Sequence, residues 1–139
     1  MTAWVRFVHN GAEAFGVLDG DTIAVHSGDM FADPAPTGTT VALSDVVLMT
    51  PCMPGKMVAL WNNSASSAEK QGLSKPEDPL YFLKVPNSFL APGAVIRKPA
   101  SYDGRVIYEA ELGIVIGRPC KDADEAEAAD AIFGYTCVN

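Results

Sequence analysis

The sequence is poor in the residues that build disulfide frameworks, zinc sites and nucleic-acid interfaces. It has only three cysteines in 139 residues, and no two of them are spaced as Cys-x-x-Cys. The odd number and the spacing of the cysteines exclude a small protein held together by disulfides and a zinc-ribbon protein. We expect free thiols in a reducing cytoplasm. Ten Lys and Arg against seventeen Asp and Glu give a net charge of −7, with no basic stripe. We therefore expect no nucleic-acid partner.

Long hydrophobic runs are also missing. Residues 1–6 lack the basic start and apolar segment of a secretion signal. No apolar run approaches the roughly 20 residues that a membrane-spanning helix needs. We expect a cytoplasmic protein without a membrane partner. A hydrophobic content of 48% with 19% charged residues predicts a folded globular chain.

The first quarter of the chain is dominated by turn signals between short apolar runs. Asn10-Gly11 is a strong hairpin signal, and Asp19-Gly20 repeats it. The runs that they separate are residues 4–8, 14–18 and 22–25. We predict a three-stranded meander, followed by a loop at residues 33–38.

Residues 50–55 mark the clearest boundary, because they contain two prolines and a glycine. The apolar stretch before them, residues 41–49, is of undefined type. We predict a small β-rich N-terminal domain at residues 1–54 and a second domain at residues 55–139. The expected fold class is α+β and mostly β.

The second part of the sequence predicts further strands and two short helices. A polar segment at residues 62–72 predicts a loop and a helix that stops at Gly72. Asp122 or Asp124 begins the second helix, whose apolar face is Ala126, Ala129 and Phe133 and which ends at Gly134. The predicted strands are residues 56–60, 80–85, 94–97, 106–116 and 135–139. A chain that stops within a strand indicates part of something longer.

Two glutamates, Glu109 and Glu111, interrupt the apolar run 106–116. Strand side chains alternate between faces, so both carboxylates share a face, roughly 7 Å apart. Two like charges on a half-apolar surface require a compensating positive charge, and a hard divalent cation supplies it. The alternative is a solvated edge strand with two ordinary surface acids. The opposite face is predicted to be core: Val106, Tyr108, Ala110, Leu112, Ile114 and Ile116.

Three stretches together resemble the fumarylacetoacetate hydrolase family. They are residues 79–88 (Pro-Leu-Tyr-Phe-Leu-Lys-Val-Pro-Asn-Ser), 108–117 (Tyr-Glu-Ala-Glu-Leu-Gly-Ile-Val-Ile-Gly) and 132–139 (Ile-Phe-Gly-Tyr-Thr-Cys-Val-Asn). The resemblance covers residues 55–139 and implies the first part of a mixed β-roll. It also implies a homodimer that uses Mg²⁺ or Mn²⁺ on an enolisable 2-oxo acid or acylpyruvate. The family's reactions are C–C hydrolysis, decarboxylation and isomerisation.

The resemblance also assigns roles to individual residues. Glu109 and Glu111 correspond to two metal ligands, and the family's third ligand, an aspartate, would follow Asn139. Lys84 corresponds to a lysine that binds the substrate carboxylate, although a lysine with its head in water is the alternative. Glu69 corresponds to the acid of the family's lid helix.

One departure from the family pattern affects the expected chemistry. The lid region, residues 61–72, contains no histidine, and Ala65 or Ser66 stands at its place. Hydrolysis needs a base for water attack, so decarboxylation, isomerisation or low activity is favoured. The competing hypothesis is a ligand-binding relative without catalysis. A third is a fragment that needs the remainder of its polypeptide, or a second chain, to act.

The two histidines offer no replacement for the missing base. His9 and His26 both lie in the predicted meander, and neither has a ligand partner at metal spacing. We expect both to be surface or structural residues.

Overall fold

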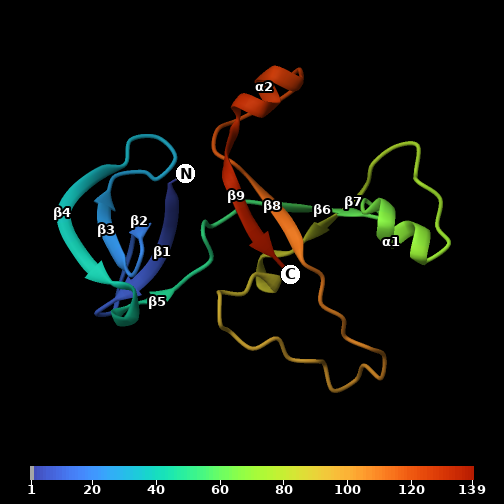
Figure 1. Ribbon diagram of the computed structural model, residues 1–139, viewed down its shortest axis with the longest axis horizontal. Helices are drawn as coiled ribbons and strands as arrows, with labels where there is room; N and C mark the ends of the chain where they lie inside the picture. The colour runs from blue at the N-terminus through green and yellow to red at the C-terminus, as the bar shows by residue number, and fades with distance from the viewer. Residues whose placement is uncertain (1) are drawn as a thin grey trace.

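A computed structural model describes residues 2–139, and it is mostly β. Strands account for 39% of the chain and helices for 13%, which confirms the predicted class. Figure 1 shows a curved N-terminal sheet at one side, a two-stranded ribbon in the middle, and a second ribbon with a short helix at the other side. No helix within residues 2–139 has the length and hydrophobicity to cross a membrane.

The N-terminal sheet has five strands in the order β4-β3-β2-β1-β5, and its neighbouring strands are antiparallel. The predicted meander is confirmed, because Asn10, Gly11 and Gly20 take the positive φ angles that tight turns between strands require. The strands are β1 (Ala3–His9), β2 (Ala12–Asp19), β3 (Thr22–Ser27), β4 (Ala35–Ala42) and β5 (Val47–Leu48).

One loop prediction in this region was wrong. Residues 33–38 were expected to form a loop, but β4 begins at Ala35 and pairs with β3. Pro36 is tolerated there because β4 is an edge strand, where one face of the backbone needs no partner. The apolar stretch 41–49 contains the end of β4, a 3₁₀ turn (Leu43–Asp45) and β5.

The second part of the chain forms two antiparallel ribbons. Strand β6 (Met57–Trp61) pairs with β7 (Leu80–Lys84), and β8 (Glu111–Ile116) pairs with β9 (Ile132–Val138). Helix α1 (Ala65–Lys70) follows β6 and ends, as predicted, just before Gly72, which has a positive φ and follows the C-cap residue Gln71. Residues 94–97 form no strand, contrary to expectation, and belong to the long connection between β7 and β8.

Helix α2 (Glu125–Asp130) precedes β9 and is shorter than predicted. Asp124 caps it in a full capping box with Glu127, which confirms one of the two expected starts. The helix ends at Asp130 because β9 begins at Ile132, so Phe133 belongs to a strand and not to the helix face. Strand pairing with β8 overrides the helical spacing of the apolar residues.

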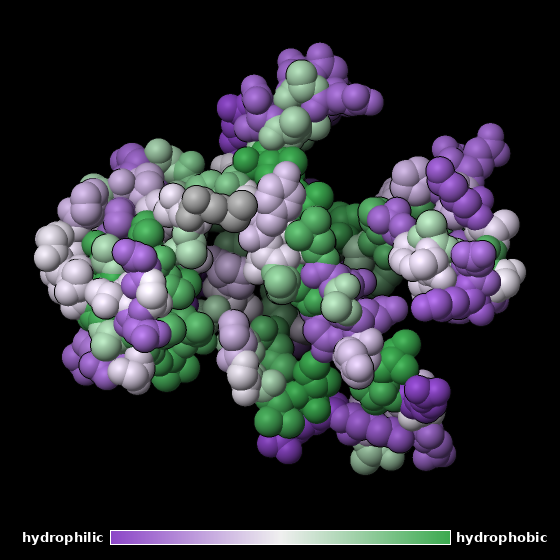
Figure 2. Space-filling view, viewed as in Figure 1, coloured by the Kyte–Doolittle hydropathy of each residue, from purple (hydrophilic) through white to green (hydrophobic). Residues whose placement is uncertain are grey.

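Buried apolar residues are few, and the large ones lie in the N-terminal part of the chain. Phe7 and Ile23 are at most 1% exposed, and Met30 is also buried. The predicted core face of the glutamate strand is instead exposed, with Leu112 at 69%. Each face of a two-stranded ribbon needs another layer to cover it, and this apolar face of β8 is left exposed. Figure 2 shows the resulting hydrophobic surface along the middle of the molecule.

Candidate functional site

The two glutamates lie at the entry to β8. Glu111 is the first residue of the strand and pairs with Val138 of β9. Glu109 lies two residues before the strand, so the prediction of a continuous strand over residues 106–116 was wrong at its beginning. Both side chains are exposed. The pairing of β8 with β9 begins at Glu111 and Val138.

Glu109 is nevertheless tied to β9 by a side chain. The backbone N–H of Glu109 donates a hydrogen bond of 2.8 Å to Oδ1 of Asn139, across 30 residues of sequence. This contact holds the backbone of Glu109 beside the end of β9, next to the Glu111–Val138 pair. Sequence reasoning missed it because the pattern of apolar residues carries no signal for a hydrogen bond between a side chain and a distant backbone group.

The donor chemistry of this pair suits a hard divalent cation. Carboxylate oxygens are the ligands that Mg²⁺ and Mn²⁺ prefer, and Mg²⁺ is often held by one or two carboxylates while water and substrate oxygens complete its shell. Within residues 2–139, no three His, Cys, Asp or Glu side chains are gathered as a metal site would gather them. Glu109 and Glu111 therefore fit as a partial ligand set.

Lys84 is the last residue of β7 and is half-buried. Its Nζ lies 5.1 Å from the centre of the Phe82 ring, on the same face of the strand, in a cation–π contact. None of the ion pairs between described residues includes Lys84. The ammonium group is thus positioned by an aromatic ring, and no carboxylate within residues 2–139 forms an ion pair with it.

The lid region, residues 61–72, contains the short helix α1 and no histidine. Ser64 caps α1 by accepting a hydrogen bond from the Ser67 N–H, and Glu69 lies exposed near the end of the helix. Figure 1 shows α1 well apart from the beginning of β8. The structure of this chain does not bring Glu69 together with Glu109 or Glu111.

Both histidine rings are held locally in the N-terminal sheet. In His9, Nδ1 donates to the Asp45 carbonyl (3.1 Å) while Nε2 accepts from the Asn10 amide (3.0 Å). In His26, Nδ1 lies 3.0 Å from the Ala24 carbonyl, and the ring packs edge-on against Trp4. These contacts agree with the structural role expected for both histidines.

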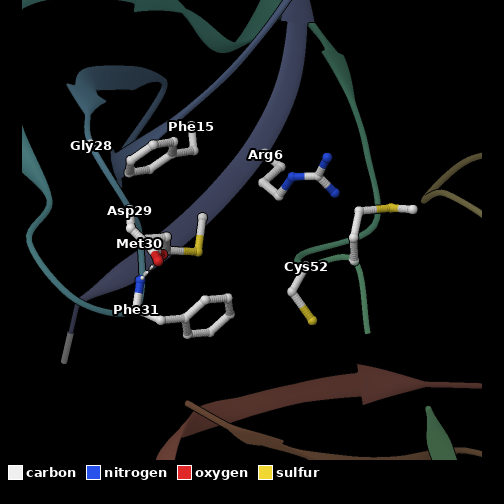
Figure 3. A pocket seen from close by; sticks show the side chains of 8 residues that line it. Arg6, Phe15, Gly28, Asp29, Met30, Phe31 and Cys52 are labelled. Carbon is white, nitrogen blue, oxygen red and sulfur yellow. Dashed lines mark hydrogen bonds between the residues drawn. The ribbon is translucent and has the colours of Figure 1, made fainter. Parts of the chain in front are cut away.

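A cavity of about 350 Å³ lies in the N-terminal part, away from the predicted site residues. Figure 3 shows Arg6, Phe15, Met30, Phe31 and Cys52 around it. The Arg6 guanidinium donates a hydrogen bond to the Thr50 carbonyl and forms an ion pair with the Glu13 carboxylate, which offsets its charge. Asp29 also lines the cavity, and its Oδ1 accepts a hydrogen bond from the Phe31 backbone N–H.

Comparisons with known proteins cover almost the whole chain. Residues 56–139 match the family model described as fumarylacetoacetate (FAA) hydrolase C-terminal. Residues 3–51 match the model described as Rv2993c-like, N-terminal. The protein Rv2993c of Mycobacterium tuberculosis is 38% identical over 136 residues, which cover 91% of this chain and 50% of that protein.

Solved structures of similar proteins have the same fold. A 2-hydroxyhepta-2,4-diene-1,7-dioate isomerase from Mycobacterium marinum is 33% identical, with a TM-score of 0.84. A 5-carboxymethyl-2-hydroxymuconate delta-isomerase from Mycobacterium smegmatis is 36% identical, also with a TM-score of 0.84. Each alignment covers 99% of this chain and 53% of the other.

The chain thus spans about half the length of the relatives that it matches. The matched family region contains both ribbons, the glutamate pair and Lys84. By its sequence match and its fold, this chain belongs to the fumarylacetoacetate hydrolase family.

Proposed function

We propose that this chain is part of a divalent-metal-dependent enzyme that isomerises an enolisable 2-oxo acid. The observation that carries the proposal is the Glu109–Glu111 pair at the entry to β8, within the family-matched region. Both carboxylates are exposed, so they are accessible to an ion and to a substrate. Mg²⁺ or Mn²⁺ is the proposed ion.

We favour isomerisation over hydrolysis because hydrolysis needs a base that activates a water molecule. Residues 61–72 contain no histidine, and His9 and His26 are held by hydrogen bonds within the N-terminal sheet. A bound cation stabilises the negative charge of an enolate, which is the common requirement of both reactions. Hydrolysis requires an activated water in addition. The names of the two isomerases above support the same choice.

Two further residues have proposed roles toward the substrate. Lys84 binds a substrate carboxylate, and its cation–π contact with Phe82 restricts the position of its ammonium group. Glu69 is the proposed acid of the lid. Because α1 lies apart from β8 in this structure, that role requires the helix to approach the ligand pair.

The proposed partner is the remainder of the same polypeptide or a second chain, in a homodimer. The exposed apolar side chains of both ribbons support this, since Leu112, Ile114 and Phe82 are all at least 44% exposed. Relatives about twice as long as this chain also support it. We further propose that the division at residues 54 and 55 separates two domains.

The decisive experiment is a metal titration of the intact protein that contains this sequence. Calorimetry with Mn²⁺ should show binding, and Glu109→Gln or Glu111→Gln should weaken it by about tenfold or more, because each removes a ligand charge. Glu77→Gln, an equally exposed glutamate in a loop, is the matched control and should bind as the unchanged protein does. No Mn²⁺ or Mg²⁺ binding by the unchanged protein would overturn the proposal.

The second candidate is a ligand-binding relative without catalysis, and the missing lid histidine favours it. Incubation of the intact protein with acylpyruvates and oxaloacetate, with and without Mg²⁺, separates the two. Metal-dependent change in the enol absorbance supports the enzyme. Metal and ligand binding without turnover supports the non-catalytic relative.

A further inference from the structure

The N-terminal sheet holds the chain beyond the end of its last strand in sequence, β5. The backbone carbonyl of Arg6 in β1 accepts a hydrogen bond from the Met49 N–H (2.8 Å), and its guanidinium donates one to the Thr50 carbonyl (3.2 Å). The Arg6 side chain is only 17% exposed, so water competes little for the second bond. Both bonds lie after Leu48, where β5 ends. Thr50 is therefore fixed against β1.

The segment that leaves Thr50 leads directly to the strand that pairs with Lys84. Residues 51–56 connect Thr50 to Met57, the first residue of β6, and Met57 pairs with Lys84 of β7. Two prolines lie within this connection, and the ring of each fixes its φ angle. A short connection with restricted backbone angles limits the position of Met57 relative to Thr50. The N-terminal sheet therefore limits where Lys84 can lie.

A β-bulge in β9 ties the second ribbon to the same sheet. Val115 pairs with Gly134, whereas the next residue of β8 pairs with Ile132. Phe133 is therefore an extra residue of β9 that the ladder skips. Bulges bend a strand and redirect a side chain. The ring of this extra residue packs against aromatic rings of the N-terminal part of the chain.

Both partners of this aromatic contact are prepared locally. Gly117 leaves room for Phe133, because a Cβ atom on Gly117 would lie 2.8 Å from the Cβ of Phe133. On the other side, the Phe31 N–H donates a hydrogen bond to Oδ1 of Asp29 (2.9 Å), and the Asp33 N–H donates one to the Asp29 carbonyl (3.1 Å). An internally bonded loop thus presents the Phe31 ring, whose centre lies 4.7 Å from that of Phe133.

We propose that the N-terminal sheet is a positioning scaffold, which fixes Lys84 of one ribbon relative to Glu109 and Glu111 of the other. Phe31 and Phe133 are its positioning residues. The inference rests on the proposed function, in which a substrate contacts the ion and Lys84 together. Both metal ligands belong to one ribbon, so release of the sheet should leave metal affinity nearly unchanged. A ligand that spans the ion and Lys84 should bind more weakly, because two contacts reinforce each other only in a fixed geometry.

The test makes two calorimetric measurements on the intact protein. The first is the affinity for Mn²⁺, and the second is the affinity of the Mn²⁺-loaded protein for oxalate. Oxalate is a stable dianion that chelates a cation through one oxygen of each carboxylate. Its other oxygens remain free to accept hydrogen bonds from the Lys84 ammonium group.

The variants remove the aromatic contact in two ways. The double variant Phe31→Ala with Phe133→Ala removes both rings. Gly117→Ala displaces the Phe133 ring and keeps the test possible if the double variant folds poorly. Gly134→Ala is the matched control on β9, because its Cβ would meet no atom within 4 Å. Lys84→Gln gives the size of the effect when the lysine contact itself is lost.

The expected results separate the scaffold from the proposed function. The double variant and Gly117→Ala should bind oxalate about tenfold more weakly, as Lys84→Gln should, while Mn²⁺ affinity stays within about twofold. Gly134→Ala should match the unchanged protein in both measurements. Unchanged oxalate affinity without the aromatic contact, or loss of Mn²⁺ and oxalate affinity in parallel, overturns the scaffold alone. Unchanged oxalate affinity in Lys84→Gln overturns the role of Lys84 and the scaffold. Absence of Mn²⁺ binding in the unchanged protein overturns the proposed function as well.

Discussion

At the scale of single residues, the three cysteines differ by their surroundings. Cys52 is half-buried at the cavity beside Arg6, whereas Cys120 and Cys137 are exposed. Burial raises the pKa of the Cys52 thiol from its ordinary value of 9.0, and the nearby Arg6 charge opposes part of that rise. Since thiolates are the reactive form, Cys52 should be the least reactive of the three.

Alkylation rates test this difference. With iodoacetamide at about pH 8, Cys52 should be modified about tenfold more slowly than Cys120, as followed by mass spectrometry of peptides. Denatured protein, in which the burial is lost, is the control and should show similar rates at both positions. Faster modification of Cys52 than of Cys120 in the folded protein would contradict the burial argument.

The same pKa shift has a consequence for stability. A thiol whose pKa is raised in the folded state favours folding while it stays protonated. Its contribution is fully present below the unfolded pKa and is lost as the pH rises through the folded pKa. Part of any fall in the free energy of unfolding above about pH 9 should therefore disappear in Cys52→Ala.

At the scale of elements, Gly16 permits the close approach of β2 and β3. A Cβ atom at this position would collide with the backbone carbonyl of Ala24 and with the Ile23 side chain. The backbone atoms cannot move without disturbing the pairing of Gly16 with Val25. Gly16 is thus required by packing in the middle of a strand, where glycine is otherwise unfavourable.

Gly16→Ala should therefore destabilise the N-terminal sheet. We expect a loss of about 1–3 kcal/mol in the free energy of unfolding, the usual range for overpacking. Urea denaturation followed by tryptophan fluorescence measures it, since Trp4 lies in β1 of this sheet. Gly55→Ala is the matched control, because its Cβ would meet no atom within 4 Å. Equal stability of the two variants would refute the packing role.

The elements also differ in how well the sequence predicts them. The hairpin turns at Asn10-Gly11 and Asp19-Gly20 and the capping box of Asp124 and Glu127 are confirmed. Each depends on backbone angles and hydrogen bonds within a few residues. The end of helix α2 was misplaced because Phe133 fits a helical spacing, while its place in β9 depends on the distant strand β8.

At the scale of the whole molecule, an aromatic cluster joins the N-terminal sheet to the central ribbon. Phe133 of β9 packs edge-on against Phe31, with ring centres 4.7 Å apart, and lies 6.5 Å from the Trp4 ring. Trp4 in turn contacts Phe15 and His26. This cluster connects residues more than 100 positions apart in sequence and limits the motion of the sheet relative to β9.

Phe133→Ala should loosen this connection. We expect a loss of about 1–2 kcal/mol in stability and faster proteolysis within residues 49–56, because aromatic pairs contribute about 0.5–1.5 kcal/mol beyond their buried area. Limited trypsin digestion, analysed by mass spectrometry, provides the measurement. Tyr135→Ala on the same strand is the control, since its side chain is 61% exposed. Equal digestion of both variants would exclude Phe133 as the connecting residue.

The sequence alone determined the mostly β class, the N-terminal meander, the two short helices and the family, because turns, caps and the residue motif at 108–117 are local. The assignment of Glu109, Glu111, Lys84 and Glu69 to the site stays a prediction. Only the tertiary structure decided that β8 begins at Glu111, that its apolar face is exposed, and that Asn139 holds Glu109. These features depend on partners supplied by residues distant in sequence, which local patterns do not encode.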